Sequence, residues 1–269
     1  MKSNLGEQAG QALLELRQRH ALVHNITNYV VMDFSANALL AVGASPVMAH
    51  AVEEVREMVA LASALVINIG TLSTPWIEAM FAAGREARDR GTPIVLDPVG
   101  AGATRLRTET ALKLISEVKP AVVRGNASEI LSLGQAGGQT RGVDSTRTVE
   151  EAQATAMQLA SAWHTCVAVT GAEDFITDGR RRFFVANGHP LMGRVTGTGC
   201  VASALTGAFC AVEKDAAAAT AFALVAYGVA GEMAAAGAPH PGTFRTRLID
   251  ALDSITPEGV TTQARVREE

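Results

Sequence analysis

A glycine-rich turn that ends in a cysteine is the segment of this chain best suited to chemistry. The sequence RVTGTGC, residues 194–200, alternates threonine with glycine and precedes a run of small residues that favours a helix. Backbone N–H groups at the start of a helix lack intrahelical acceptors and carry the positive end of the helix dipole, so they attract anions. We therefore expect Gly197, Thr198 and Gly199 to hold an anionic group, with Cys200 beside it.

Polar residues also stand at or just after the ends of four short apolar runs, which we interpret as buried strands over residues 65–69, 94–96, 121–123 and 166–169. These polar residues are Asn68, Asp97, Arg124, Asn126, Glu129 and Thr170. Any one asparagine, aspartate or threonine here could simply cap the next helix. Because parallel strands share one carboxyl edge, where ligands bind in open α/β sheets, the whole set favours a polar cleft at that edge.

The elements that would position this cleft alternate along the chain. Helical patterns cover residues 1–20, 52–62, 75–90, 105–117, 128–133 and 149–163, and later 200–212, 216–236 and 241–255. Residues 175–177 and 182–185 flank Asp178-Gly179, which indicates a hairpin. The βαβ repetition predicts an α/β fold of three layers, α/β/α, around a mostly parallel central sheet. We expect one domain over residues 1–256 and a loose tail over 257–269.

Composition excludes several classes of partner. The net charge of −4 gives no basic field for nucleic acid, and we expect none as a partner. The N-terminal segment lacks the apolar core of a signal peptide, and no charge-free apolar stretch of about 18 residues indicates a membrane span. Cys166, Cys200 and Cys210 form no C-x-x-C pair, so neither a disulfide framework nor a zinc cluster is indicated. A cytoplasmic location fits best.

Phosphoryl transfer would use every part of the expected cleft. The reaction needs a metal that bridges phosphate oxygens, cationic or N–H donors around them, and an oriented acceptor oxygen. Asp97 and Glu129 offer hard oxygen ligands for Mg²⁺, Arg124 can pair with a phosphate, and the glycine amides can hold developing charge. Neither a P-loop motif nor a G-x-G-x-x-G fingerprint after a first strand is present, so a nucleotide would be held differently.

Several long motifs together make the sequence similar to a known family. They are HNITNYV (24–30), ANALLAVGASPVMAH (36–50), VLDPVGAGAT (95–104), VVRGNASEI (122–130), VTGAEDFITDG (169–179) and VTGTGC (195–200). In this order they resemble the hydroxyethylthiazole kinase family of the ribokinase superfamily, over residues 20–250. The resemblance implies ATP-dependent phosphorylation of the primary alcohol of 4-methyl-5-(2-hydroxyethyl)thiazole, a salvage step of thiamine biosynthesis. It also implies a homotrimer with sites between subunits.

The resemblance assigns roles residue by residue. Arg124 and Thr170 would contact ATP, Met48 and Gly197 the thiazole, and Asp97, Glu129 and Asn126 would organise Mg²⁺, while Asn25 and Thr27 would lie near the thiazole. Without the resemblance, Met48 is better explained as a core residue. His24 is better explained as a hydrogen-bonded structural histidine than as a base.

Two hypotheses account for a cysteine where the superfamily usually places an aspartate. Cys200 could be a weak base or a group that orients the acceptor alcohol, or it could be a covalent nucleophile activated by a base such as His189. Within the same fold, a dehydratase for hydrated nicotinamide nucleotide and a hydroxymethylpyrimidine kinase remain alternatives, although both typically carry aspartate here. A ligand-binding sensor without turnover is the alternative from another class.

Overall fold

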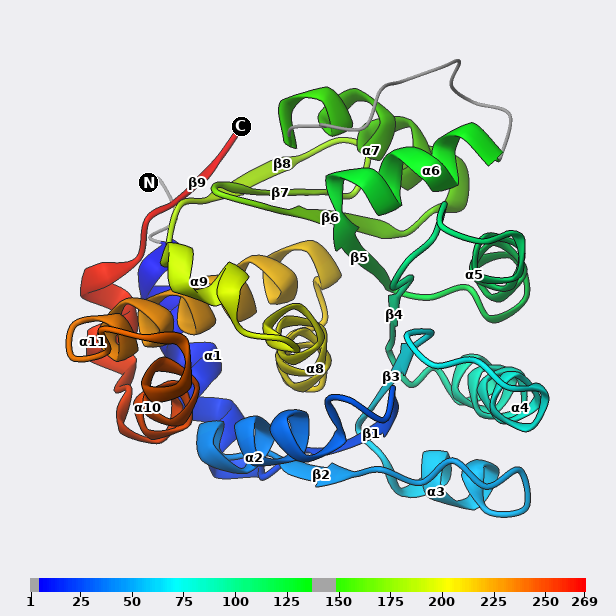
Figure 1. Cartoon of the computed structure of the whole chain (residues 1–269), viewed down its shortest axis with the longest axis horizontal. Helices are drawn as coiled ribbons and strands as arrows, with labels where there is room; N and C mark the ends of the chain where they lie inside the picture. The colour runs from blue at the N-terminus through cyan, green and yellow to red at the C-terminus, as the bar shows by residue number, and fades with distance from the viewer. Residues whose placement is uncertain (1–4, 137–148) are drawn as a thin grey trace.

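Within the part of the chain that the structure describes, a nine-stranded sheet with helices on both faces forms the framework (Figure 1). The computed structural model describes residues 5–136 and 149–269. Across the sheet the strands follow the order β2 (Ser45–Val47), β1 (Leu22–Ile26), β3 (Ala64–Asn68), β4 (Ile94–Asp97), β5 (Val122–Asn126), β6 (Cys166–Thr170), β7 (Asp174–Thr177), β8 (Arg182–Val185) and β9 (Val266–Glu268). The five pairings from β2 through β1 to β6 are parallel, and the last three pairings are antiparallel. The predicted α/β fold with a mostly parallel sheet is thus confirmed.

Helices complete the two outer layers (Figure 1). On one side lie α1 (Leu5–Arg19), α2 (Met32–Val42), α8 (Thr198–Cys210), α9 (Ala216–Ala235), α10 (Pro241–Ser254) and α11 (Pro257–Gln263), and on the other α3 (Val55–Leu61), α4 (Thr74–Arg90), α5 (Arg105–Val118), α6 (Ala127–Ala136) and α7 (Val149–Trp163). A short 3-10 helix, η1 (Pro190–Arg194), precedes α8. Each face of the sheet has its own buried apolar cluster because the strands are apolar on both faces.

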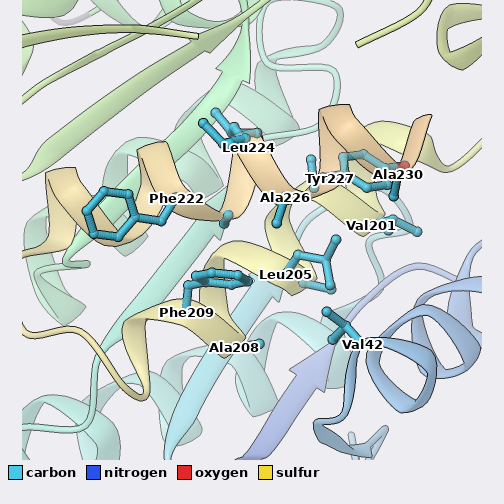
Figure 2. Packing of buried hydrophobic residues seen from close by; sticks show 14 of the residues in the cluster. Val42, Val201, Leu205, Ala208, Phe209, Phe222, Leu224, Ala226, Tyr227 and Ala230 are labelled. Atoms are coloured by element: carbon cyan, nitrogen blue, oxygen red, sulfur yellow. The ribbon is translucent and has the colours of Figure 1, made fainter. Parts of the chain in front are cut away.

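Small residues let α8 lie close to the sheet. A Cβ on Gly207 would lie 2.6 Å from a methyl group of Val66, so the helix could not keep this distance with a larger residue there. Figure 2 shows Leu205 and Phe209 of α8 packed with side chains of α9. By length and composition α9 is the one helix among the described residues that could cross a membrane, yet 78% of its apolar window is buried inside the protein, as in a core helix.

The segment after Pro257, which we expected to be loose, is ordered, and that expectation is wrong. Thr256 caps α11 by accepting the N–H of Gly259, and β9 pairs with β8 at the edge of the sheet. The tail is also tied by ion pairs, among them the one between Arg267 and Glu173. Strand β9 is short and its charged residues are exposed, as is usual at a sheet edge, so its sequence shows no apolar alternation that would indicate a strand.

The strand order reverses at β1, and this position locates the cleft. From β1 the chain passes to β2 on one side, whereas β3 and the later strands lie on the other. Ligands in open α/β sheets bind outside the carboxyl ends of the strands at such a switch point. The N-terminus of α8 lies near this point, because a Cβ on Gly197, directly before the helix, would lie 2.8 Å from Val31 in the loop after β1.

Candidate active site

The turn before α8 has the geometry of an anion site. Gly197 is the N-cap, with a φ of +94°, and the helix begins at Thr198, earlier than the sequence indicated. The N–H of Val201 reaches the carbonyl of Gly197 at 2.9 Å and closes the first turn. The preceding N–H groups of Gly199 and Cys200 have no acceptor within the helix, which follows from helix geometry. They are available to a negatively charged group together with the helix dipole.

Thr198 anchors the turn instead of facing an anion with its side chain. Its hydroxyl donates to the carbonyls of Met192 at 2.8 Å and Val195 at 3.1 Å. The Thr198 N–H is directed at the Val195 carbonyl at 3.5 Å, and the Thr198 carbonyl accepts the buried Tyr227 hydroxyl at 3.0 Å. Of the three amides expected to hold an anion, that of Thr198 is therefore turned inward, whereas that of Gly199, like that of Cys200, has no acceptor within the helix.

Arg124 connects the predicted metal-binding and nucleotide-binding residues. Its guanidinium donates to the Thr170 hydroxyl at 2.6 Å and lies 3.6 Å from a carboxylate oxygen of Asp97. A Cβ on Gly199 would lie 3.1 Å from the same guanidinium, so α8 begins directly against it. Arg124 is 8% exposed. A fixed, buried cation beside free amides is suited to bind phosphate oxygens.

Asp97 is a buried carboxylate with one committed and one free oxygen. Its Oδ2 accepts the Ser203 hydroxyl at 2.8 Å and the Asn68 amide at 2.9 Å. Its Oδ1 is buried and has no hydrogen-bond partner among the described residues. Burial raises the pKa of Asp97 to about 6, although the charge of Arg124 acts in the opposite direction. An unpaired carboxylate oxygen at this position can coordinate a metal ion or accept a hydrogen bond from one of the metal's water ligands.

Glu129 and Asn126 form a reciprocal cap at the start of α6. Glu129 Oε2 accepts the Asn126 N–H at 2.8 Å, and Asn126 Oδ1 accepts the Glu129 N–H at 3.0 Å. Glu129 Oε1 also accepts the N–H of Gly100, at 2.9 Å, and so holds the loop after β4 against the loop after β5. Each oxygen of Glu129 retains a lone pair, but the carboxylate already has a structural role.

A pocket of about 520 Å³ extends from Arg124 along η1 and α9. Its walls include four predicted site residues, Arg124, Thr170, Thr198 and Gly199. Other residues that line it are Asp174, Asn187, Gly188, Met192, Leu224 and Tyr227. Burial raises the pKa of Asp174 to about 7, opposed by the N–H of Gly171 that its carboxylate accepts at 2.9 Å. Such a partly apolar cavity with an Arg and helix amides at one end has the size and chemistry of a nucleotide site.

The C-terminal segment fixes one wall of this pocket. The backbone N–H of Arg265 donates to the Asn187 side chain at 2.7 Å, and the Arg265 guanidinium pairs with Glu232 at 2.5 Å. Glu232 in turn accepts the N–H of Gly188 at 2.7 Å. Sequence reasoning missed this wall, because its three parts are far apart in the chain and no local pattern links them.

Cys200 is a half-buried neutral thiol. Burial raises its pKa to about 11, and the negative charge of Asp97 acts in the same direction. The Nδ2 of Asn28 donates to the sulfur at 3.5 Å. His189, considered above as an activating base, accepts the N–H of Leu191 and has its ring beside Phe244. A neutral thiol without a histidine partner among the described residues is a poor nucleophile, which favours an orienting role.

Besides Gly197, the residues predicted near the thiazole lie at or just after the ends of β1 and β2. Asn25 is buried in β1, where its Nδ2 bonds to the Val23 carbonyl at 3.0 Å, and Thr27 follows the strand. The loop after β1 reaches the turn, since a Cβ on Gly197 would lie 2.8 Å from Val31. Met48 directly follows β2, the neighbouring strand. The sequence indicated these positions only through the resemblance.

His24 is structural, as its residue type suggested. Its Nε2 lies 2.7 Å from the Ala49 carbonyl, and burial lowers its pKa. Ser203 and Asn28 were not among the predicted site residues. Ser203 could have been found from its spacing, because three residues after Cys200 it lies on the same side of α8.

The fold and this site define a class, that of small-molecule kinases with a ribokinase-like fold. The fold is shared with a ribokinase-like superfamily protein from Enterococcus faecalis, which is 15% identical, with a TM-score of 0.63 over 90% of this chain and 89% of that one. The sequence profile of the Hydroxyethylthiazole kinase family matches residues 13–258. The chain belongs to the hydroxyethylthiazole kinase family.

Two similar proteins within that family illustrate the relation. A hydroxyethylthiazole kinase from Desulfotalea psychrophila is 53% identical over 99% of this chain and 97% of its own length. A solved structure of the hydroxyethylthiazole kinase protein from Pyrococcus horikoshii is 51% identical, with a TM-score of 0.90 over 97% of this chain and 99% of that one. The family that the motifs resembled is therefore confirmed.

Proposed function

We propose that this chain transfers the γ-phosphoryl group of ATP to the hydroxyl of 4-methyl-5-(2-hydroxyethyl)thiazole, a salvage step of thiamine biosynthesis. The observation that carries the proposal is the position of Arg124, which joins Asp97 to Thr170 directly against the start of α8. Phosphoryl transfer depends on positioning and charge neutralisation, and these groups supply both.

In this proposal the triphosphate lies between Arg124 and the amides of Gly199 and Cys200, and the rest of the nucleotide occupies the 520 Å³ pocket. Thr170 holds the guanidinium in place through its hydroxyl. The thiazole lies on the other side of the turn, toward Gly197 and the loop after β1. Its hydroxyl meets the phosphoryl group beside Cys200, whose neutral thiol orients the alcohol.

Mg²⁺ fits these residues as a water-bridged ion on the phosphates. Asp97 offers a buried oxygen without a hydrogen-bond partner among the described residues, and Glu129 and Asn126 offer oxygens that are already tied to backbone groups. In the part of the chain that the structure describes, no group of three or more histidine, cysteine, aspartate or glutamate side chains is placed to hold a metal ion by itself. When bound, Mg²⁺ would neutralise phosphate charge, as it usually does with one or two carboxylates and several waters.

We further propose a homotrimer with sites between subunits, in the cytoplasm. The support is a pair of exposed apolar side chains beside the site, with Tyr29 63% and Val30 71% exposed. Tyr29 and Val30 belong to the loop after β1, which reaches the turn. A neighbouring subunit would cover these side chains and could complete the thiazole pocket.

The proposed function is tested by ADP formation with ATP and Mg²⁺, measured with hydroxyethylthiazole, with hydroxymethylpyrimidine and with neither alcohol. We expect ADP that depends on the thiazole and disappears when EDTA removes the metal. Folded protein that binds ATP but turns over neither alcohol would contradict the proposal and favour a dehydratase or a sensor. Preferential turnover of the pyrimidine would contradict the substrate assignment.

A further inference from the structure

Asn28 is a buried side chain that the proposed reaction does not yet use. It lies on the loop after β1, is 5% exposed, and contacts two other elements, β3 and α8, as well as its own loop. Its Nδ2 donates to Asn68 Oδ1 at 2.9 Å and to Cys200 Sγ at 3.5 Å, while its Oδ1 accepts the N–H of Val30 at 3.1 Å. The side chain thus connects the switch point of the sheet to the first turn of α8.

Backbone N–H groups fix the direction of every hydrogen bond in this chain of amides. The N–H of Gly70 can only donate, and it donates to Asn68 Oδ1 at 2.9 Å, so the Nδ2 of Asn68 faces the Asp97 carboxylate at 2.9 Å. In the same way Val30 fixes the oxygen of Asn28, so both N–H bonds of its Nδ2 are donated, one of them to sulfur. Cys200 is therefore an acceptor on the side that faces Asn28.

Close packing holds Asn28 in this position. A Cβ on Gly70 would lie 2.6 Å from Asn28 Nδ2, so the loop after β3 presses against the amide and only a glycine leaves room for it. Because Asn68 also bonds to Asp97, the sulfur of Cys200 is tied through two amides to the carboxylate at the end of β4. Three neighbouring strand ends and α8 are thereby held in one arrangement.

We propose that Asn28 is a positioning residue for Cys200. It occupies one acceptor position of the sulfur with an N–H, and so turns the remaining lone pair toward the alcohol of the substrate. The inference rests on the proposed function, since the alcohol is the proposed acceptor. Asn28 acts through Cys200, so its effect on turnover requires the thiol, whereas a purely structural asparagine would have the same effect with or without it.

A double-mutant cycle tests this dependence. Asn28→Ala is made in the parent chain and in Cys200→Ala, and kcat and the KM for ATP are measured for all four proteins. We expect Asn28→Ala to lower kcat by about fivefold in the parent, the factor for one neutral hydrogen bond, and by less than about twofold in Cys200→Ala. The KM for ATP stays within about twofold. An equal loss of kcat in both backgrounds would overturn the proposal. The surface variant Asn37→Ala is the matched control.

A second measurement requires no turnover. Alkylation of Cys200 by iodoacetamide is followed by peptide mass spectrometry in the parent and in Asn28→Asp, which keeps the shape of the side chain and the acceptor for Val30 but presents an oxygen to the sulfur. We expect alkylation to slow by about fivefold, because the N–H that stabilises the thiolate is lost. Cys166 and Cys210 are buried and serve as internal references. An unchanged or faster rate in folded protein would overturn the proposal.

The two measurements also separate this inference from the proposed function. If the parent chain has no turnover with the thiazole, the proposed function fails, yet the alkylation rates still test the contact between Asn28 and Cys200. If the parent turns over and the cycle shows no coupling, the function stands and the positioning role fails.

Discussion

We predict that the charged form of the Asp97 carboxyl at the site destabilises the folded chain. The substitution Asp97→Asn tests this prediction. Burial raises the pKa of this carboxyl from 3.8 to about 6. Between these values the folded protein binds a proton that the unfolded chain does not, so the free energy of unfolding falls as pH rises. At 1.36 kcal/mol per pKa unit, the full effect above pH 6 is about 3 kcal/mol.

The substitution removes this pH dependence. For pKa values of about 6 and 3.8, linkage predicts that this carboxyl lowers the parent's free energy of unfolding by about 1.4 kcal/mol between pH 5 and pH 8. The variant lacks this decrease. The carbonyl of the new amide can still accept from Ser203 and Asn68, but its NH₂ enters a place where Asp97 Oδ1 has no partner, at a pH-independent cost of about 1–2 kcal/mol. The variant should therefore gain stability relative to the parent on going from pH 5 to pH 8, while it loses turnover.

Urea unfolding followed by circular dichroism, at one protein concentration and at both pH values, measures the difference. The exposed variant Asp89→Asn is the matched control, since the same substitution at the surface should change the free energy of unfolding by less than about 0.5 kcal/mol. The reasoning is refuted if Asp97→Asn loses stability relative to the parent between pH 5 and pH 8, or if its relative stability does not change with pH.

Three other substitutions test the site. Cys200→Asp should retain or raise kcat, because a neutral thiol contributes little as a base. Complete loss of turnover in folded protein would favour the covalent hypothesis. A shift in the intact mass of the protein after addition of substrate would also support that hypothesis. Gly197→Ala should lower the free energy of unfolding in urea by at least about 1–2 kcal/mol, because its φ is +94° and a Cβ would lie 2.8 Å from a valine side chain; unchanged stability would contradict this. Arg265→Gln should raise the KM for ATP about two- to fivefold with kcat unchanged, because the ion pair between Arg265 and Glu232 supports the pocket wall. The control is Arg182→Gln, which breaks an ion pair away from the pocket. An equal effect of both substitutions on the KM would refute the role of Arg265.

The residues at the strand ends were predictable because a parallel sheet gathers its carboxyl ends at one edge. Asp97, Arg124 and Thr170 were found in this way, and the structure joins them through one guanidinium. The helix over residues 149–163 was also predicted with the bounds it has. Strong helical and apolar periodicity determines such elements locally.

Other features depend on contacts between distant segments. Strand β1 contains buried His24 and Asn25, so its apolar pattern is interrupted, and we treated the segment only as a motif. The earlier start of α8 reflects the anchoring of Thr198 by η1 and Tyr227, which no local propensity reports. The contact between Asn28 and Cys200 joins residues 172 positions apart. By contrast, the reciprocal cap formed by Asn126 and Glu129 could be predicted from their spacing of three, although we considered capping only for the asparagine and assigned both residues to Mg²⁺.

The most direct test of the central claim is to follow the label from ATP that carries ³²P at the γ position, in the presence of Mg²⁺ and hydroxyethylthiazole. We predict one labelled thiazole phosphate ester for each ADP, with no label on the protein, because the alcohol meets the phosphoryl group at the start of α8. Release of labelled inorganic phosphate without the ester, or label retained on the protein, would contradict direct transfer to the thiazole alcohol.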